Sequence, residues 1–232
     1  MIPLYDDNPT RRTPVLVVSL IATCIGVFLF QASLGREAAM VWVYRLGAIP
    51  AVVTGEVQLH PDLAGPVPAS ATLVTSMFLH GGLLHLAGNM LYLWIFGNNV
   101  EDALGHGRFL VFYLGAGILA ALAHVWMDPA SEVPMIGASG AISGVLGAYL
   151  LLYPRAEVAV LIPIGFILQL VRLPAVVVLV LWFVFQFLSN LFAAGQDGAG
   201  VAWMAHIGGF VVGMALLFLF KPRTVPLFGD GR

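Results

Sequence analysis

The chain has 232 residues, 60% of them hydrophobic and only 9% charged, and its formal net charge is −2. Soluble domains are about one quarter charged and less than half apolar, so this composition excludes an ordinary soluble protein. Basic residues are few and form no patch, which argues against nucleic acid as a partner. Apolar runs of about 20 residues recur along the chain, and they predict an all-α integral membrane protein in contact with the lipid bilayer.

Apolar runs in the sequence predict six spanning helices. They lie near residues 13–33, 71–103, 108–127, 137–154, 174–194 and 202–220. The polar residues 1–12 and 221–232 are then two tails, and residues 13–220 form one six-span domain.

Two connections between the predicted spans are unusual. The first loop, residues 34–70, is long and holds four prolines and an aromatic pair that suits a membrane interface. We expect an interfacial, partly helical loop there. Residues 156–173 are apolar but interrupted by Pro163 and Gly165, which predicts a surface-lying or re-entrant connection.

Basic residues are distributed unevenly between the two sides of the predicted bundle. With the N-terminus inside, only Arg36 and Arg45 lie in outer segments. The inner segments hold Arg11, Arg12, Arg108, Arg155, Arg172, Lys221, Arg223 and Arg232. This bias predicts a multi-pass protein with both termini in the cytoplasm, and the compact six-span chain suits a bacterial inner membrane. The acidic pair 101–102 lies at the inner end of the second span, where we expect solvated or capping roles.

Four polar residues lie early in the even-numbered spans. His85 and Asn89 are in the second span, and Ser139 opens the fourth. His206 lies early in the sixth. These spans all run from outside to inside, so the four side chains share one depth near the outer face. Because polar groups inside a membrane are costly and normally face a bundle interior or a wet cavity, their convergence indicates a shared site.

Small residues recur at helical spacing on the fourth and sixth spans. They are Gly140, Gly144 and Gly147 in the fourth, and Ala205, Gly209 and Gly213 in the sixth. Such faces let membrane helices approach closely. Close packing would bring the Ser139 hydroxyl within hydrogen-bond reach of His206, which a base-activated serine requires.

No Asp or Glu lies inside a predicted span near His206. A Ser–His dyad is therefore a more economical prediction than a triad, whose carboxylate would have to fold in from an outer loop. The candidates for such a carboxylate are Asp128, Glu132 and Asp197. A serine nucleophile also needs donors for a developing oxyanion. The Asn89 amide, His85 and the backbone N–H of Ser139 are placed to supply them.

Three segments resemble the signature motifs of the rhomboid intramembrane serine proteases. They are residues 80–89 (HGGLLHLAGN), 137–140 (GASG) and 205–209 (AHIGG). Their order and the six-span topology match as well, and the resemblance extends from about Leu73 to Phe220. Each motif alone is a weak signal, but three in register, with the right spans between them, are a specific one.

The resemblance implies a role for each matched residue. Ser139 matches the family nucleophile and His206 its general base, while Asn89 and His85 match residues that line the oxyanion hole. Supporting positions are expected at His80, Gly137, Gly140 and Gly209. Proteins of this family cleave single-span membrane proteins near the outer face, without a metal or another cofactor. The fifth span and the outer loop after it resemble the family's lateral gate and cap.

Two features depart from the family pattern. Ser143 stands where some bacterial members have a tyrosine, one turn after the nucleophile and beneath the base. Residues 70–72 (SAT) replace an aromatic–Arg pair that is often found before the first histidine motif.

Two other functions fit parts of the pattern. His60 and His124, taken with the histidines of the motifs, would suit a histidine-lined metal transporter, although no carboxylate or thiol completes a ligand set. A catalytically inactive rhomboid-like protein would bind membrane clients without cutting them. Such proteins commonly lack the nucleophile or the base, whereas Ser139 and His206 are both present here.

Overall fold

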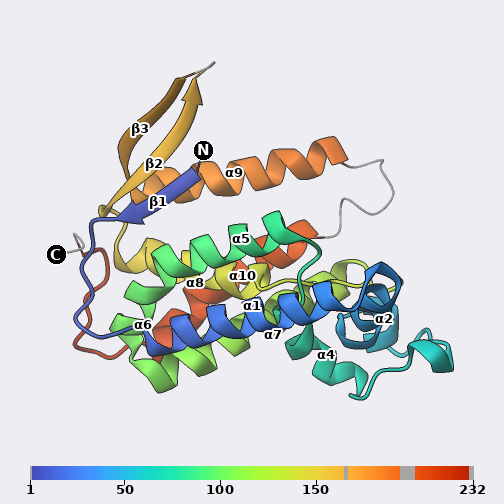
Figure 1. Cartoon of the computed structure of the whole chain (residues 1–232). Coiled ribbons are helices and arrows are strands. Elements are labelled where there is room, and N and C mark those ends of the chain that lie inside the picture. The colour runs from blue at the N-terminus through green and yellow to red at the C-terminus, as the bar shows by residue number, and fades with distance from the viewer. Residues whose placement is uncertain (1, 165–166, 194–201, 230–232) are drawn as a thin grey trace.

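The fold comes from a computed structural model, which describes residues 2–164, 167–193 and 202–229. Long helical segments make up most of the described chain (Figure 1). They are α1 (Val15–Ser33), α5 (Leu83–Tyr92) with a π-helical turn (Leu93–Gly97) and α6 (Asn98–Leu104), α7 (His106–Met127), α8 (Ser139–Leu152), α9 (Ala175–Ala193) and α10 (Ala202–Phe220). The predicted apolar runs agree with these bounds to within a few residues, except for 71–103, whose first part forms a short helix and a 3-10 turn so that α5 begins only at Leu83.

Short helices fill the long segment between α1 and α5. They are α2 (Arg36–Leu46), α3 (Pro50–Val53), α4 (Ala69–Thr75) and single 3-10 turns at Pro61–Leu63 and Ser76–Phe78. The Thr75 hydroxyl donates a 2.6 Å hydrogen bond to the carbonyl of Leu46, which ties the end of α4 to the end of α2. The loop is thus partly helical, while its position at a membrane interface stays a prediction.

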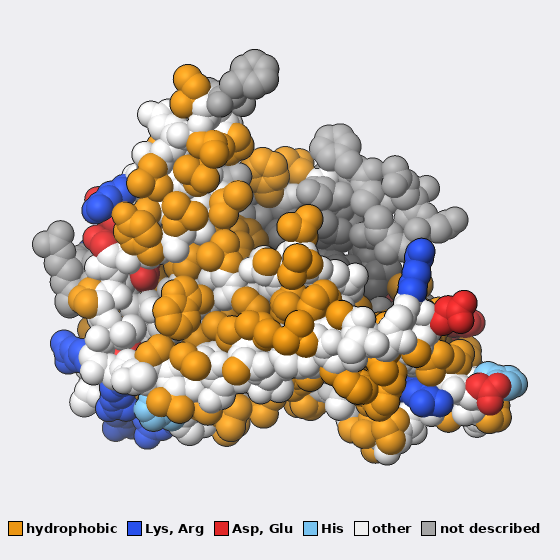
Figure 2. Space-filling model, viewed as in Figure 1, with side chains coloured by type: hydrophobic (Ala, Val, Ile, Leu, Met, Phe, Trp, Pro, Cys, Tyr) orange, Lys and Arg blue, Asp and Glu red, His pale blue; other side chains and the backbone are white. Residues whose placement is uncertain are grey.

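The apolar helices differ in their ability to cross a membrane. Among the described residues, α1 and α7 are long and apolar enough by themselves. The segments 69–78 and 83–104 pass the same test together but bend by 85° between them. The described parts of α8, α9 and α10 are apolar and shorter. Figure 2 shows hydrophobic side chains over α1 and α5, with Lys and Arg gathered toward the two ends of the molecule. This pattern suits a membrane protein, and the count of six spans stays a prediction.

Helix α8 forms the centre of the bundle. Each residue from Ala141 to Tyr149 is buried. Its neighbours are α7 and α10, and the π-helical turn packs there too through the Phe96 ring, whose centroid lies 5.0 Å from that of Tyr149. A helix that is apolar on every side is stable only when it is surrounded in this way.

A three-stranded antiparallel sheet corrects the all-α prediction. Its order is β1 (Ile2–Asp6), β2 (Glu157–Ile164), β3 (Ile167–Pro174). Residues 156–173, predicted to be a surface-lying or re-entrant connection, form the β2–β3 hairpin, and the predicted polar tail supplies β1. The pairing of Ile2 with Leu161 joins segments far apart in the sequence, which periodicity within one segment does not reveal. Pro163 lies opposite Leu168 of β3 but beyond the residues of β2 that β1 pairs with, so β2 is an edge strand there, where proline is tolerated.

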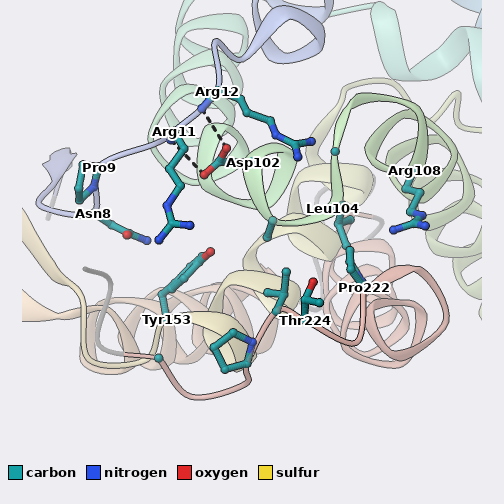
Figure 3. A pocket seen from close by; sticks show the side chains of 15 residues that line it. Asn8, Pro9, Arg11, Arg12, Asp102, Leu104, Arg108, Tyr153, Pro222 and Thr224 are labelled. Atoms are coloured by element: carbon teal, nitrogen blue, oxygen red, sulfur yellow. Dashed lines mark hydrogen bonds between the residues drawn. The ribbon is translucent and has the colours of Figure 1, made fainter.

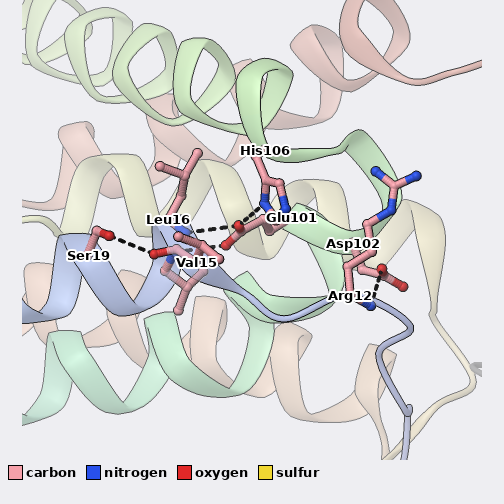
Figure 4. A network of polar contacts seen from close by, with 8 residues as sticks. Arg12, Val15, Leu16, Ser19, Glu101, Asp102 and His106 are labelled. Carbon is pink, nitrogen blue, oxygen red and sulfur yellow. Dashed lines mark hydrogen bonds and ion pairs between the residues drawn. The ribbon is translucent and has the colours of Figure 1, made fainter.

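The acidic pair at the end of α6 fastens the start of α1 (Figure 4). The Glu101 carboxylate accepts hydrogen bonds from the backbone N–H groups of Leu16 (2.9 Å) and Val17 (2.8 Å). It also lies 2.5 Å from Nδ1 of His106, the first residue of α7. Glu101 therefore caps α1, as predicted, but it is only 1% exposed and so is not solvated. The Asp102 carboxylate accepts from the backbone N–H groups just before α1.

The sheet is fastened to the bundle through Asp6. The Tyr149 hydroxyl of α8 donates a 2.6 Å hydrogen bond to Oδ2 of Asp6. Burial raises the pKa of Asp6 from 3.8 to about 6, against the opposing effect of this hydrogen bond. The folded protein therefore binds a proton at Asp6 more tightly than the unfolded chain does, so this group lowers the free energy of unfolding as the pH rises from about 4 to about 6.

Replacing Asp6 with asparagine should remove that pH dependence. The asparagine carbonyl can still accept from Tyr149, and it carries no charge to desolvate. We expect the thermal midpoint of Asp6→Asn in detergent, relative to wild type, to be higher at pH 7.5 than at pH 4.5. The matched control is Asp7→Asn, at the next position of the chain. Parallel pH profiles of wild type and Asp6→Asn would contradict the assignment.

Candidate active site

Ser139 and His206 meet across the interface of α8 and α10. The Ser139 Oγ lies 2.7 Å from Nε2 of His206, although 67 positions separate the residues. Ser139 is the first residue of α8, and His206 lies near the start of α10. With its proton on Nδ1, the neutral imidazole accepts a hydrogen bond from the serine hydroxyl at Nε2.

Gly137 shapes the turn that presents Ser139. Its φ is +117°, a left-handed conformation that residues with a side chain rarely adopt. A Cβ at this position would also lie 2.8 Å from Nε2 of His85. Both facts favour glycine here, and the second places the backbone before Ser139 directly against the His85 ring.

Glycines hold α8 and α10 in backbone contact. A Cβ on Gly209 would collide with the carbonyl oxygen of Gly140, and one on Gly213 with the backbone of Gly144. A Cβ on Gly147 would collide with the carbonyl oxygen of Phe210. The two helices therefore pack through the faces that the sequence spacing indicated, and this contact brings the hydroxyl to the imidazole.

A cavity of about 280 Å³ opens beside the serine–histidine pair. Its lining residues are Leu84, His85, Gly88, Asn89, Tyr92, Ile136, Ser139, Ile142, Trp182 and His206. The structure thus brings the four polar residues singled out by sequence to one cavity. Most of the lining residues lie on α5, α8, α9 and α10. The cavity is large enough for several atoms of a bound chain.

Hydrogen bonds orient the two polar side chains of α5. Nδ1 of His85 accepts from the backbone N–H of Gly81 at 3.4 Å, so the neutral ring carries its proton on Nε2, beside Gly137. The Asn89 amide nitrogen donates one hydrogen to the carbonyl of His85 at 3.1 Å. Its second hydrogen is not used in that bond, and Asn89 is only 7% exposed.

His80 lies behind His85 and does not line the cavity. Its ring packs edge-on against the His85 ring at a centroid distance of 5.2 Å. The side chain is 2% exposed, and its backbone N–H donates to Oε1 of Gln31 on α1. His80 therefore connects the site to the first helix.

Trp182 of α9 is a site residue that the sequence reasoning missed. Its ring centroid lies 6.0 Å from that of His206 and 6.1 Å from that of Tyr92 on α5. Ser143, which stands where some family members have a tyrosine, is not aromatic; its hydroxyl donates to the carbonyl of Ser139 at 2.7 Å, and its side chain is fully buried. The one feature of the sequence that could have indicated this residue is that Trp182 is the only tryptophan between residues 174 and 194.

The remaining histidines lie away from the cavity. His60 accepts a hydrogen bond from the backbone of Asp62 in the first loop, and His124 is buried in α7. In the part of the chain that the structure describes, no three His, Cys, Asp or Glu side chains are grouped closely enough to hold a metal ion.

The two described acidic candidates for a triad do not line the cavity. Asp128 ends α7, and Glu132 is exposed in the loop before α8. Asp197 and the loop expected to act as a cap lie outside the described residues.

Comparison with known proteins matches these motifs to one family. The family model of the rhomboid domain matches residues 69–223. "Rhomboid protease GluP" of Bacillus subtilis is 38% identical over 144 residues, which cover 62% of this chain and 25% of that protein. "Putative rhomboid protease YdcA" of the same species is 40% identical over 78 residues, 34% of this chain and 39% of that protein.

A eukaryotic relative shows the same similarity. "Rhomboid protein 1, mitochondrial" of Saccharomyces cerevisiae is 34% identical over 96 residues, 40% of this chain and 28% of that protein. The chain thus spans well under half the length of these relatives. The rhomboid model nevertheless covers more than half of the chain and contains all three motifs. The chain therefore belongs to the rhomboid family, and it is an integral membrane protein.

Proposed function

We propose that this protein is an intramembrane serine endopeptidase that cleaves single-span membrane proteins with a Ser139–His206 dyad. The observation that carries the proposal is the 2.7 Å contact between the Ser139 hydroxyl and His206 Nε2 at the wall of a cavity. A nucleophile and a base within hydrogen-bond reach are the geometric requirement for covalent catalysis by serine.

The first half of the reaction forms an acyl-enzyme. Ser139 Oγ attacks the carbonyl carbon of the scissile peptide bond while its proton passes to Nε2 of His206. The resulting tetrahedral intermediate carries a negative charge on the former carbonyl oxygen. When it collapses, His206 gives the proton to the leaving amine, the C–N bond breaks and an ester to Ser139 remains.

The second half consumes one water molecule. His206 takes a proton from the water as the water oxygen attacks the ester carbon. The proton then returns to Ser139 Oγ as the C–O ester bond breaks. The products are an amine and a carboxylate, and the dyad is restored without a metal or another cofactor.

Three donors are suited to the intermediate's oxyanion. They are the free amide hydrogen of Asn89, the Nε2–H of His85 and the backbone N–H of Ser139 at the start of α8. The first two side chains line the same cavity as the nucleophile. His80 supports the His85 ring from behind, while the Gly140–Gly209 contact sets the spacing of the dyad.

A substrate helix must unwind before its backbone can enter this cavity. In a helix each peptide carbonyl is hydrogen-bonded and covered by side chains, so cleavage should favour segments with helix-breaking residues. Trp182 and Tyr92 line the cavity from α9 and α5, and we propose that the substrate enters between these helices. With both termini cytoplasmic, in a bacterial inner membrane, the cut lies near the outer face.

The proposal is tested by proteolysis in vesicles. Wild-type protein is reconstituted with a single-span substrate that carries Gly and Pro near one end of its span, and the products are identified by mass spectrometry. We expect one principal cut near that end, unchanged by a chelator. Loss of cleavage with the chelator would favour the metal-dependent alternative. Substrate capture without any cut would favour the inactive, client-binding alternative.

Asn89→Ala should lower kcat by about 10²- to 10³-fold with little change in KM, because it removes a donor used mainly in the transition state. The matched control is Asn98→Ala, which removes an amide further along the same helical segment, at the start of α6 and outside the cavity lining. We expect the control to cut within about twofold of wild type, since among the described residues the half-buried Asn98 side chain bonds only the backbone N–H of Asn99 and does not line the cavity. An unchanged kcat in Asn89→Ala would remove this residue from the oxyanion site.

A further inference from the structure

A second and larger cavity lies at the other end of the helices that carry the dyad (Figure 3). Its volume is about 530 Å³. It is formed where the chain enters α1, where α6 meets α7, and where α8 and α10 end. Nothing in the proposed proteolysis uses it, since Ser139 and His206 lie at the opposite ends of α8 and α10.

Three arginines line this cavity. Arg11 and Arg12 come from the segment before α1, and Arg108 from the first turn of α7. Figure 3 shows the Arg11 side chain pointing toward Tyr153, with Arg108 on the other side of the cavity. The Arg12 guanidinium lies against Gly105, where an added Cβ would be 3.1 Å from Nη1.

One carboxylate faces the same cavity and is already hydrogen-bonded. The Asp102 oxygens accept from the backbone N–H groups of Arg11 (3.1 Å) and Arg12 (3.0 Å). These bonds use the main chain and leave the guanidinium groups available. With three cationic side chains and one anionic side chain, the described lining has a formal charge of +2.

The start of α7 adds to this positive field. Gly105, which precedes the helix, lines the cavity together with Arg108. The first N–H groups of a helix have no partner within it, and a 22-residue helix such as α7 carries a partial positive charge at that end. Guanidinium groups and helix N-termini both favour phosphate oxygens as acceptors.

We propose that this cavity binds a phosphate-bearing anion at the membrane boundary. Its position at the ends of membrane helices makes the headgroup of an anionic phospholipid one source, because basic pockets between spanning helices hold such headgroups. Free phosphate from water is the other source with the same chemistry. By contacting all three arginines, the bound anion would hold the entry to α1 against the start of α7.

The test measures binding to detergent-purified protein with three probes. They are dihexanoyl phosphatidylglycerol, dihexanoyl phosphatidylcholine and inorganic phosphate. Two surface arginines contribute about thirtyfold to the binding of an anionic headgroup, so Arg11→Gln with Arg12→Gln should raise the Kd for the anionic lipid by about that factor. Glutamine keeps the backbone N–H groups that Asp102 accepts from, so the fold should survive. The single variant Arg108→Gln tests whether the arginine on the other side of the cavity contributes to the same Kd.

Arg223→Gln is the matched control. Arg223 lies at the same end of the bundle, is exposed and does not line the cavity. It should leave the Kd unchanged, and Ser139→Ala should bind as wild type does, because this cavity is remote from the dyad. Tight binding of phosphatidylglycerol alone would assign the lipid, and equally tight binding of inorganic phosphate would assign the soluble anion. Equal affinity for the neutral lipid, or an Arg223→Gln effect as large as that of the double variant, would overturn the proposal.

Discussion

Replacing Ser139 with alanine should reduce cleavage of a single-span substrate by on the order of 10⁴-fold or more, because the change removes the only atom that forms the acyl-enzyme. The fold should survive, since a hydroxyl that bonds only the imidazole is lost and no cavity larger than one oxygen is left. The measurements are the initial rate of cleavage in vesicles and the thermal midpoint of the purified variant.

Ser143→Ala is the matched control for that variant. It removes the same atom from the same helix, one turn later, where the hydroxyl bonds the Ser139 carbonyl rather than His206. We expect its rate to stay within a few-fold of wild type, because hydroxyl bonds back to the preceding turn contribute little to helix stability. If Ser139→Ala still cleaves while Ser143→Ala does not, the nucleophile has been assigned wrongly.

Gly209→Ala should strongly reduce the proposed proteolysis by disturbing the interface between α8 and α10. The new Cβ would collide with the carbonyl oxygen of Gly140, a backbone atom that cannot rotate away as a side chain could. Helices α8 and α10 must then separate, which moves His206 from Ser139. Overpacking of this kind costs about 1–3 kcal/mol of stability, and a displacement of about 1 Å can cost 10²-fold in rate. We therefore expect both a lower thermal midpoint and a rate at least about 100-fold lower.

Gly26→Ala provides the comparison. Gly26 lies in the middle of α1, and a Cβ there meets nothing within 4 Å. Alanine has the higher helix propensity, so this variant should keep full activity and match or exceed wild type in stability. Normal cleavage by Gly209→Ala would mean that the glycine contact does not set the geometry of the dyad.

The helices of the fold were predictable, and the sheet was not. Apolar runs such as that of α7 predict a helix by their length and composition alone. The pairing of β1 with β2 joins residues 2–6 to residues 158–161, and neither segment alone shows in its sequence that the two pair. The polar tail contains a strand whose partner, β2, lies far away in the sequence. Pro163 argued against a strand, but it lies beyond the residues of β2 that pair with β1.

The candidate site was predictable where motif and topology agreed. Ser139 and His206 were paired because both stand at the outer ends of small-residue faces that could pack closely, and the structure places the two side chains 2.7 Å apart. Trp182 was not predicted, because one aromatic residue in an apolar run has no distinguishing pattern. Its place beside His206 depends on how α9 is rotated against α5 and α10, which periodicity does not specify.

The most direct test of the proposed function is labelling with a fluorophosphonate probe, followed by peptide mapping of the adduct. This reagent reacts with a serine hydroxyl that a neighbouring base activates, so it reports the nucleophile and the base in one experiment. We predict a single adduct on Ser139, which is lost in Ser139→Ala and strongly reduced in His206→Ala. An adduct on another residue, or persistent cleavage by a protein that the probe never labels, would contradict the Ser139–His206 dyad.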